Sequence, residues 1–100
     1  MTRADVRRYL VAYDIASDSR REKVAKRLQA YGDRVQYSVF VVDASPVRLQ
    51  RLRVGLEELI DPGQDSIIFC DLGLAAGVDG SRFNALGRSR VLTGPDSFIV

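Results

Sequence analysis

The chain has 100 residues, of which 46% are hydrophobic and 28% are charged, and its formal net charge is +2 at pH 7. This length and composition predict one globular domain rather than a disordered chain, and no apolar run approaches the roughly 18 residues of a membrane-spanning helix. The chain contains no histidine. Histidine-based triads and histidine-ligated zinc are therefore excluded, and any catalysis relies on carboxylates, a metal ion or bound water.

The N-terminal residues and the single cysteine bear on the cellular compartment. The segment MTRADVRR (1–8) is followed by no hydrophobic region with a small-residue cleavage site, so we expect no secretion signal. Cys70 cannot form an intramolecular disulfide, and its apolar neighbours predict a reduced, buried thiol. We therefore expect a cytoplasmic protein.

The first predicted strand covers 9–13 and is apolar on both faces, which is typical of a central strand. A carboxylate, Asp14, follows this strand directly. Further along the chain, 6 basic residues lie between Arg20 and Arg34. Their clustering is more informative than the small net charge, because bulk charge alone does not indicate a nucleic-acid partner.

The segment 16–32 carries the signals of a helix. A capping-box pattern starts at Ser19, although Ser17 or Asp18 would also serve as the N-cap. Gly32 is expected to end the helix. The buried face should carry the apolar residues that recur at helical spacing: Val24, Leu28 and Tyr31.

Residues 34–43, RVQYSVFVVD, are rich in β-branched and aromatic residues and predict extended structure. No Gly, Pro, Asn or Asp precedes Asp43 to form a turn, so the segment is either one long bent strand or kinks near Ser38. Alternation predicts two opposite faces, one with Val35, Tyr37, Val39 and Val41 and the other with Gln36, Ser38, Phe40 and Val42.

A second helix is predicted over 45–63, with Ser45 as its N-cap and Pro46 in the first helical position. The sequence Asp-Pro-Gly at 61–63 is expected to end it. Another strongly apolar strand follows at 65–72. The buried stripe of the helix should consist of leucines, namely Leu49, Leu52, Leu56 and Leu59.

The predicted order is β-α-β-α-β with a break inside the middle strand. This is the split βαβ arrangement of an α+β, ferredoxin-like sandwich. We expect a single domain over 1–100 with its core at about 8–72. Residues 73–100 are expected to form an irregular, glycine-containing tail and an extra C-terminal strand.

The position of Asp14 allows two interpretations. Ligands gather beyond the carboxyl ends of strands in open α/β sheets, so a carboxylate there, beside the basic start of a helix, is suited to hold a divalent cation and face a phosphate. Alternatively, Asp14 starts the loop or caps a turn. Position alone favours this second interpretation.

Three segments, YLVAYDI (9–15), SRREKVAKRL (19–28) and GDRVQYSVF (32–40), follow in an order and spacing that resemble the CRISPR-associated nuclease family. Within it, they are most similar to the second of the two core spacer-acquisition proteins, Cas two. The hallmarks are Tyr-Asp-Ile at the end of the first strand and Gly-x-x-Val-Gln-x-Ser-Val-Phe about twenty residues later. The resemblance covers 8–72, including DPGQDSIIF (61–69), and extends only loosely into the tail.

The resemblance implies a small ferredoxin-like homodimer. In it, two copies of Asp14 face each other across the two-fold axis and hold Mg²⁺ or Mn²⁺ between them. The implied catalytic residues are Asp14, which also binds the metal, and Tyr13. The implied nucleic-acid-binding residues are Arg20, Arg21, Lys23 and Arg34. The residues implied to support the site or the dimer are Gln36, Ser38 and Phe40.

Each of these roles has a structural alternative when the residues are considered alone. Tyr13 is equally suited to be a packed aromatic, and Phe40 to be a core residue. Basic residues on a helix are usually a solvated face, and Arg20 stays undecided between the two roles. Gln36 and Ser38 are also ordinary polar positions on a strand face.

The implied function is a metal-dependent endonuclease of RNA, double-stranded DNA or both, acting in spacer acquisition during antiviral defence. It would work as a homodimer with an integrase partner. The alternative is a non-catalytic DNA-binding scaffold for the spacer-integration complex. A more remote alternative is a toxin-type RNA-cleaving module on the same fold. The final SFIV (97–100) is expected to add a strand to the partner's sheet.

Overall fold

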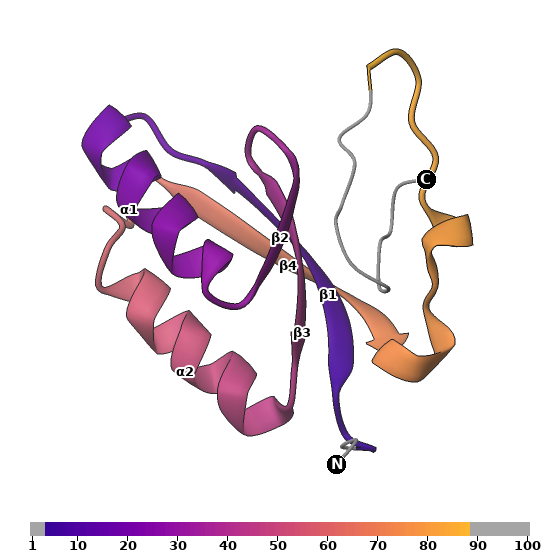
Figure 1. The fold of residues 1–100 in the computed structure, drawn as a ribbon. Helices are drawn as coiled ribbons and strands as arrows, with labels where there is room; N and C mark the ends of the chain where they lie inside the picture. The colour runs from indigo at the N-terminus through magenta and orange to yellow at the C-terminus, as the bar shows by residue number, and fades with distance from the viewer. Residues whose placement is uncertain (1–3, 89–100) are drawn as a thin grey trace.

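A four-stranded antiparallel sheet in the order β2-β3-β1-β4 carries the fold, with β1 in its interior as the apolar sequence predicts. The computed structural model describes residues 4–88. In chain order its elements are β1 (Arg7–Asp14), α1 (Asp18–Gln29), β2 (Gly32–Gln36), β3 (Val39–Ala44), α2 (Pro46–Glu57) and β4 (Ser66–Leu74). Both helices cover one face of the sheet (Figure 1), which confirms the α+β, ferredoxin-like prediction. The predicted C-terminal strand lies outside the described residues.

Side chains alternate along β1 between two very different environments. Tyr9, Val11 and Tyr13 are buried under the helices, and Val11 is fully inaccessible. Asp14, at the end of the strand, is exposed on the opposite face of the sheet, which we call the open face. Leu10 and Ala12, which share the open face with Asp14, are half-buried.

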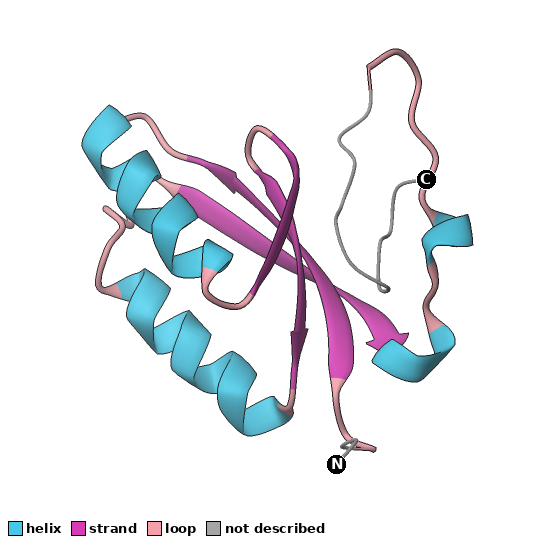
Figure 2. Ribbon diagram, in the orientation of Figure 1, coloured by secondary structure: helices cyan, strands magenta, loops and turns pink. Residues whose placement is uncertain are grey.

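Residues after β4 cover part of the open face. The strand continues to Leu74, past the predicted start of the irregular tail, and two short 3₁₀ turns follow, η1 (Ala75–Gly77) and η2 (Gly80–Arg82). Figure 2 shows these turns on the side of the sheet away from the helices. Phe83 then packs against Val35 and Val41 of the hairpin. The part of the open face that carries Val35 and Val41 is thereby covered, and Asp14 stays exposed.

The middle segment is a β-hairpin, so the kink predicted near Ser38 is confirmed. Tyr37 and Ser38 form the two-residue connection between β2 and β3. The register shifts between Arg34 and Gln36, which marks a bulge. The predicted faces hold for Val35, Val39 and Val41, which cluster on the open face, and for Phe40 and Val42, which lie in the core beneath the helices. They are wrong for Gln36, which lies with Val35 and Val39 on the open face, and for Tyr37, which lies on the helix side, because the bulge shifts the alternation.

The start and end of α1 differ from the capping-box prediction. Ser17 is the N-cap, since its side chain accepts a hydrogen bond from the backbone N–H of Arg20 at 3.2 Å, so the alternative cap is correct and the assignment to Ser19 is wrong. Gly32 does not end the helix as predicted, because α1 already stops at Gln29 and Gly32 opens β2.

The α2 helix begins as predicted and ends early. Ser45 accepts a hydrogen bond from the backbone N–H of Arg48 at 3.3 Å, and Pro46 is the first helical residue. The helix stops at Glu57, ahead of the predicted Asp-Pro-Gly stop. The leucine stripe packs as predicted, with Leu52 and Leu56 buried and Leu49 and Leu59 partly buried against the core. Within residues 4–88, no helix combines the length and the apolar character that a membrane span requires.

The prediction of a buried thiol at Cys70 is wrong, because Cys70 is exposed. β4 is an edge strand, and its alternate side chains point to the core and to the open face. Ile67 and Phe69 pack against the core, whereas Ile68 is 59% exposed on the same face as Cys70. A continuous apolar run is typical of a strand that is buried on both faces, but here it belongs to an edge strand with one exposed face.

The close approach of β2 to β3 at Gly32 gives a stability prediction. A Cβ atom there would lie 2.0 Å from the backbone oxygen of Val41, whereas a Cβ at Gly77 would meet nothing within 4 Å. We expect Gly32→Ala to lower the free energy of unfolding by about 1–3 kcal/mol through steric displacement of β2. Urea denaturation measures this loss, with Gly77→Ala as the control expected within about 0.5 kcal/mol of wild type. Equal stability of the two variants would contradict the close contact.

Candidate functional site

The Asp14 carboxylate lies free at the end of β1. Its backbone is fixed by pairing with Ser66 of β4. Among the described residues, no side chain or backbone group forms a hydrogen bond or ion pair with this carboxylate. The acid therefore neither caps a turn nor balances a cation within residues 4–88. An exposed carboxylate on a rigid strand end is available to an external cation.

The donor chemistry at Asp14 fits a hard divalent cation, but one chain supplies little of the coordination shell. Within residues 4–88, no group of three or more Cys, Asp or Glu side chains is close enough to hold a metal ion. Mg²⁺ is commonly bound through one or two carboxylates together with waters and phosphate oxygens. Asp14 matches that pattern as one carboxylate, and any second carboxylate has to come from another chain or from beyond the described residues.

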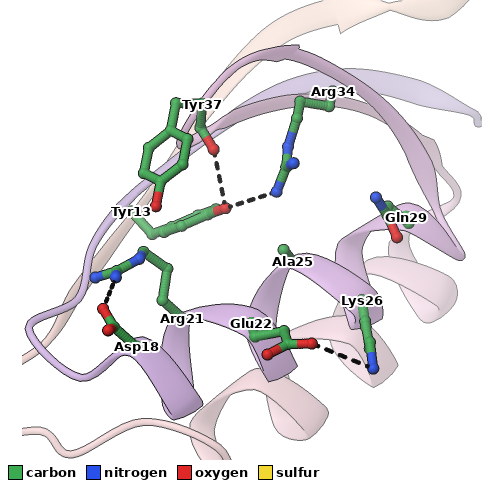
Figure 3. A pocket seen from close by; sticks show the side chains of 9 residues that line it. All are labelled: Tyr13, Asp18, Arg21, Glu22, Ala25, Lys26, Gln29, Arg34 and Tyr37. Carbon is green, nitrogen blue, oxygen red and sulfur yellow. Dashed lines mark hydrogen bonds and ion pairs between the residues drawn. The ribbon is translucent and has the colours of Figure 1, made fainter.

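A cavity of about 510 Å³ lies between α1 and the β2–β3 hairpin, on the opposite side of β1 from Asp14. Figure 3 shows Tyr13, Arg34 and Tyr37 on the sheet side of this cavity and the α1 side chains across from them. The cavity is lined by Tyr13, Asp18, Arg21, Glu22, Ala25, Lys26, Gln29, Arg34 and Tyr37. The structure thus separates two groups of predicted site residues, with Asp14 on the open face and Tyr13, Arg21 and Arg34 under the hairpin.

Tyr13 is a packed aromatic whose hydroxyl reaches the cavity. The side chain is only 5% exposed and stacks on Phe40, with the ring centroids 6.3 Å apart. Its hydroxyl donates to the backbone oxygen of Tyr37 at 3.3 Å and accepts from Arg34 at 3.4 Å. Because Tyr13 and Asp14 point to opposite faces of the sheet, these two residues do not form one side-chain pair.

Arg34 is the cation of this cavity that lacks a carboxylate partner within residues 4–88. Its guanidinium lies over the ring of Phe40, 5.1 Å from the centroid, and its Nε is buried without a hydrogen-bond partner among the described residues. The two carboxylates of the cavity are already engaged, Asp18 by Arg21 and Glu22 by Lys26. A partly buried, unpaired guanidinium is suited to receive an anion such as a phosphate.

Arg21 connects the cavity to the loop that follows Asp14. It forms an ion pair with Asp18 and donates to the backbone oxygen of Ile15 at 2.7 Å. Its guanidinium also lies over the exposed ring of Tyr37, 6.0 Å from the centroid. These three contacts hold the Arg21 guanidinium in place beside the loop that follows β1.

The other basic candidates occupy different surroundings. Lys23 is exposed on α1 and does not line the cavity. Lys26 is an exposed charge that also lines the rim of the cavity, with its Nζ 3.5 Å from Glu22. Arg20 is bound to Asp65 through its Nε at 2.6 Å and Nη2 at 3.1 Å.

The predicted supporting residues divide between the core and the surface. Phe40 is fully inaccessible beneath the helices, so its side chain does not reach the open face. Ser38 contributes its backbone oxygen, which accepts from the backbone N–H of Tyr13 at 3.0 Å and ties the hairpin to β1. Gln36 is exposed beside the part of the open face that the 83–86 segment covers.

Asp65 is a residue that sequence reasoning did not single out. Its side chain is fully inaccessible and accepts bonds from Arg20 and from the backbone N–H groups of Ala16 and Asp61. An acidic residue directly before a buried-looking strand, as in QDSIIF (64–69), was the available signal. The hydrogen bond from Arg20, with the backbone donors adding to it, lowers the pKa of Asp65 from the usual 3.8 to about 2.

The depressed pKa of Asp65 predicts the direction of acid sensitivity. Because the unfolded carboxyl binds its proton at a higher pH than the folded one, the Arg20–Asp65 pair stabilises the fold above roughly pH 4 and loses this contribution as the pH falls toward about 2. We expect the urea-unfolding free energy of wild type to fall more steeply across this window than that of Asp65→Asn, which is less stable at neutral pH. Parallel pH profiles for the two proteins would contradict the assignment.

Known proteins resemble this chain across the region that contains the site. The family model described as CRISPR associated protein Cas2 matches residues 7–75. The CRISPR-associated endoribonuclease Cas2 3 of Synechocystis sp. is 42% identical over 64 residues, which cover 64% of this chain and 70% of the relative.

Solved structures agree with the family match. Streptococcus pyogenes Cas2 superposes with a TM-score of 0.72 at 34% identity, covering 80% of this chain and 99% of its own. A chain of a partial Cas6-RT-Cas1–Cas2 complex gives a TM-score of 0.60 at 33% identity, covering 66% of this chain and 73% of its own. The matched region runs from the start of β1 to the end of β4 and includes Asp14, the α1 basic residues and the hairpin. The chain therefore belongs to the Cas2 family of CRISPR-associated proteins.

Proposed function

We propose that this Cas2 protein is a metal-dependent endonuclease that hydrolyses phosphodiester bonds of RNA, DNA or both during spacer acquisition. The observation that carries the proposal is the free Asp14 carboxylate, which is exposed at a rigid strand end and has no partner within residues 4–88. Relatives that are named endoribonucleases share the matched region. A carboxylate that no group within residues 4–88 binds is available to hold the metal ion that would activate water in a nuclease without histidine.

A second copy of the chain completes this site in our proposal. The part of the open face around Asp14 carries half-buried Ala12 and a 59% exposed Ile68, a surface whose apolar character suits contact with a second copy. In a two-fold symmetric dimer a residue near the axis meets its own mate. One acid per chain then supplies two carboxylates, which is the number that Mg²⁺ or Mn²⁺ sites of this type use together with phosphate oxygens.

The residues around the site have separate proposed roles in metal binding and in phosphate binding. When bound, Mg²⁺ or Mn²⁺ supplies Lewis-acid activation of water and of the scissile phosphate. Asp14 would hold the ion on the open face, and Arg21, Lys23 and Arg34 would bind the negatively charged backbone where it passes α1 and the hairpin on the other side of β1. Tyr13 supports Arg34 through its hydroxyl and Phe40 supports Tyr13 through its ring. Arg20 is left out of the phosphate contacts because its guanidinium is bound to Asp65.

The alternative function is a non-catalytic DNA-binding scaffold that docks an integrase partner. The likeness to a chain of a partial Cas6-RT-Cas1–Cas2 complex favours it, because that protein belongs to an assembly that also contains Cas1. The cations suit either function, since phosphate contacts position a nucleic acid whether or not it is cleaved. The two functions differ only in whether Asp14 is required.

Substitution of Asp14 separates catalysis from binding. We expect Asp14→Asn to reduce Mg²⁺-dependent cleavage of labelled single-stranded RNA or duplex DNA by about 100-fold or more, the scale of losing a group that acts directly on the reaction. Binding of the same substrates, followed by fluorescence anisotropy, should change little. Asp33→Asn is the matched control, because Asp33 is also an exposed strand carboxylate but lies on β2.

Three results bear on the proposal. Asp14→Asn with wild-type cleavage would contradict it, as would wild-type protein that cleaves none of these substrates with Mg²⁺ or Mn²⁺. Spacer acquisition in cells that survives Asp14→Asn but fails with Arg34→Gln would establish the scaffold instead.

A further inference from the structure

We propose that Asp65 and Arg20 are positioning residues that fix the backbone carrying the Asp14 carboxylate, and that Arg20 serves this purpose rather than phosphate binding. The inference rests on the proposed role of Asp14 in holding a divalent cation. It concerns how the chain holds the strand end that presents this side chain before any ligand binds. We call the Asp65–Arg20 pair, with its backbone donors, the clamp.

Asp65 is bonded as fully as a carboxylate can be. One oxygen accepts from Arg20 Nη2 at 3.1 Å and from the backbone N–H of Ala16 at 3.4 Å. The other accepts from Arg20 Nε at 2.6 Å and from the backbone N–H of Asp61 at 2.9 Å. The side chain has no solvent-accessible surface. Asp65 therefore cannot touch a nucleic acid or a cation on the open face, and its effect on the site is indirect.

The groups that Asp65 binds hold Asp14 from both sides. Ala16 lies two residues after Asp14 in the chain, and Arg20 lies in the first turn of α1. Ser66, which follows Asp65 directly, is the residue paired with Asp14 across the β1–β4 ladder. The clamp thus joins the loop that leaves Asp14 to the strand that pairs with it, and it fixes the backbone on which the carboxylate stands.

A second Arg–Asp pair shows what a purely structural tie between these strands looks like. Arg7 donates to Asp71 at 2.9 Å and joins β1 to β4 at the opposite end from Asp14. Both of its side chains are partly exposed, in contrast to the inaccessible Asp65. At the Asp14 end, Arg20 binds through two nitrogens to a carboxylate that is fully buried, whereas an ordinary surface ion pair leaves its carboxylate exposed.

The test compares the two pairs by NMR of the full-length protein. Mn²⁺ broadens amide signals near its site, so a titration reports affinity at Asp14 without any cleavage. We expect Asp65→Asn to weaken the Mn²⁺ effect on Asp14 about tenfold, the lower end of the loss seen when a residue supporting a metal ligand is removed. Asp71→Asn, the matched control, should leave it unchanged. Arg20→Lys keeps the positive charge but removes the paired N–H donors of the guanidinium, so we expect it to lose less Mn²⁺ affinity than Asp65→Asn. It keeps the test possible if Asp65→Asn does not fold.

The salt dependence of nucleic-acid binding distinguishes the two possible roles of Arg20, positioning and phosphate binding. The slope of log affinity against log salt should stay at the wild-type value in Arg20→Lys and Arg20→Gln, and should become shallower by about 1 in Arg34→Gln. An equally shallow slope in Arg20→Gln would overturn the assignment. Wild-type Mn²⁺ affinity in both folded Asp65→Asn and Arg20→Lys would also overturn it.

The failure of the proposed function would give a different result. Wild-type protein whose Asp14 signal does not respond to Mn²⁺, or Asp14→Asn that responds like wild type, would show that no cation binds at Asp14. That outcome removes the basis of the positioning role together with the proposed function. A response in wild type that is lost in Asp14→Asn but retained in the clamp variants overturns the positioning role alone.

Discussion

Successive side chains of β1 point to opposite faces of the sheet, and this alternation places the phenol of Tyr13 in the helix-covered core and the carboxylate of Asp14 on the open face. The two neighbouring residues that the sequence motif joins are therefore used in different ways. Tyr13 packs on Phe40 and supports the cavity under the hairpin. Asp14 lies on an exposed surface at the end of β1, an interior strand of the sheet. The fold needs β1 to be central for both purposes, since only an interior strand is fixed by ladders on each side.

Some charged side chains around the site have ion-pair partners within the chain, and others have none among residues 4–88. Arg20 is bound to the inaccessible carboxylate of Asp65, and Arg21 is paired with Asp18. Arg34 and Asp14 have no ion-pair partner among residues 4–88, one on each side of β1. Burying charge is costly unless it is paired, so natural chains usually satisfy such groups. Groups left unpaired beside satisfied ones are the better candidates for contacts with a ligand.

Much of the fold was predictable because local signals agreed with the tertiary packing. Ser45 and Pro46 defined the start of α2, and the alternation in 34–43 sorted Val41 from Phe40 correctly. Cys70 was placed wrongly because an apolar run contains no information on which face the chain leaves uncovered. The role of Arg20 stayed undecided between a phosphate contact and a solvated charge, because its partner Asp65 lies 45 residues further along the chain. A contact between residues that distant is a property of the topology.

The account depends on two Asp14 carboxylates sharing one cation across a two-fold axis. The most direct measurement is an anomalous difference map from crystals of the protein grown with Mn²⁺. We predict a single strong peak on the axis between the two copies of Asp14, and no such peak for Asp14→Asn. Copies whose Asp14 side chains point away from each other, or a Mn²⁺ peak remote from both of them, would contradict the account.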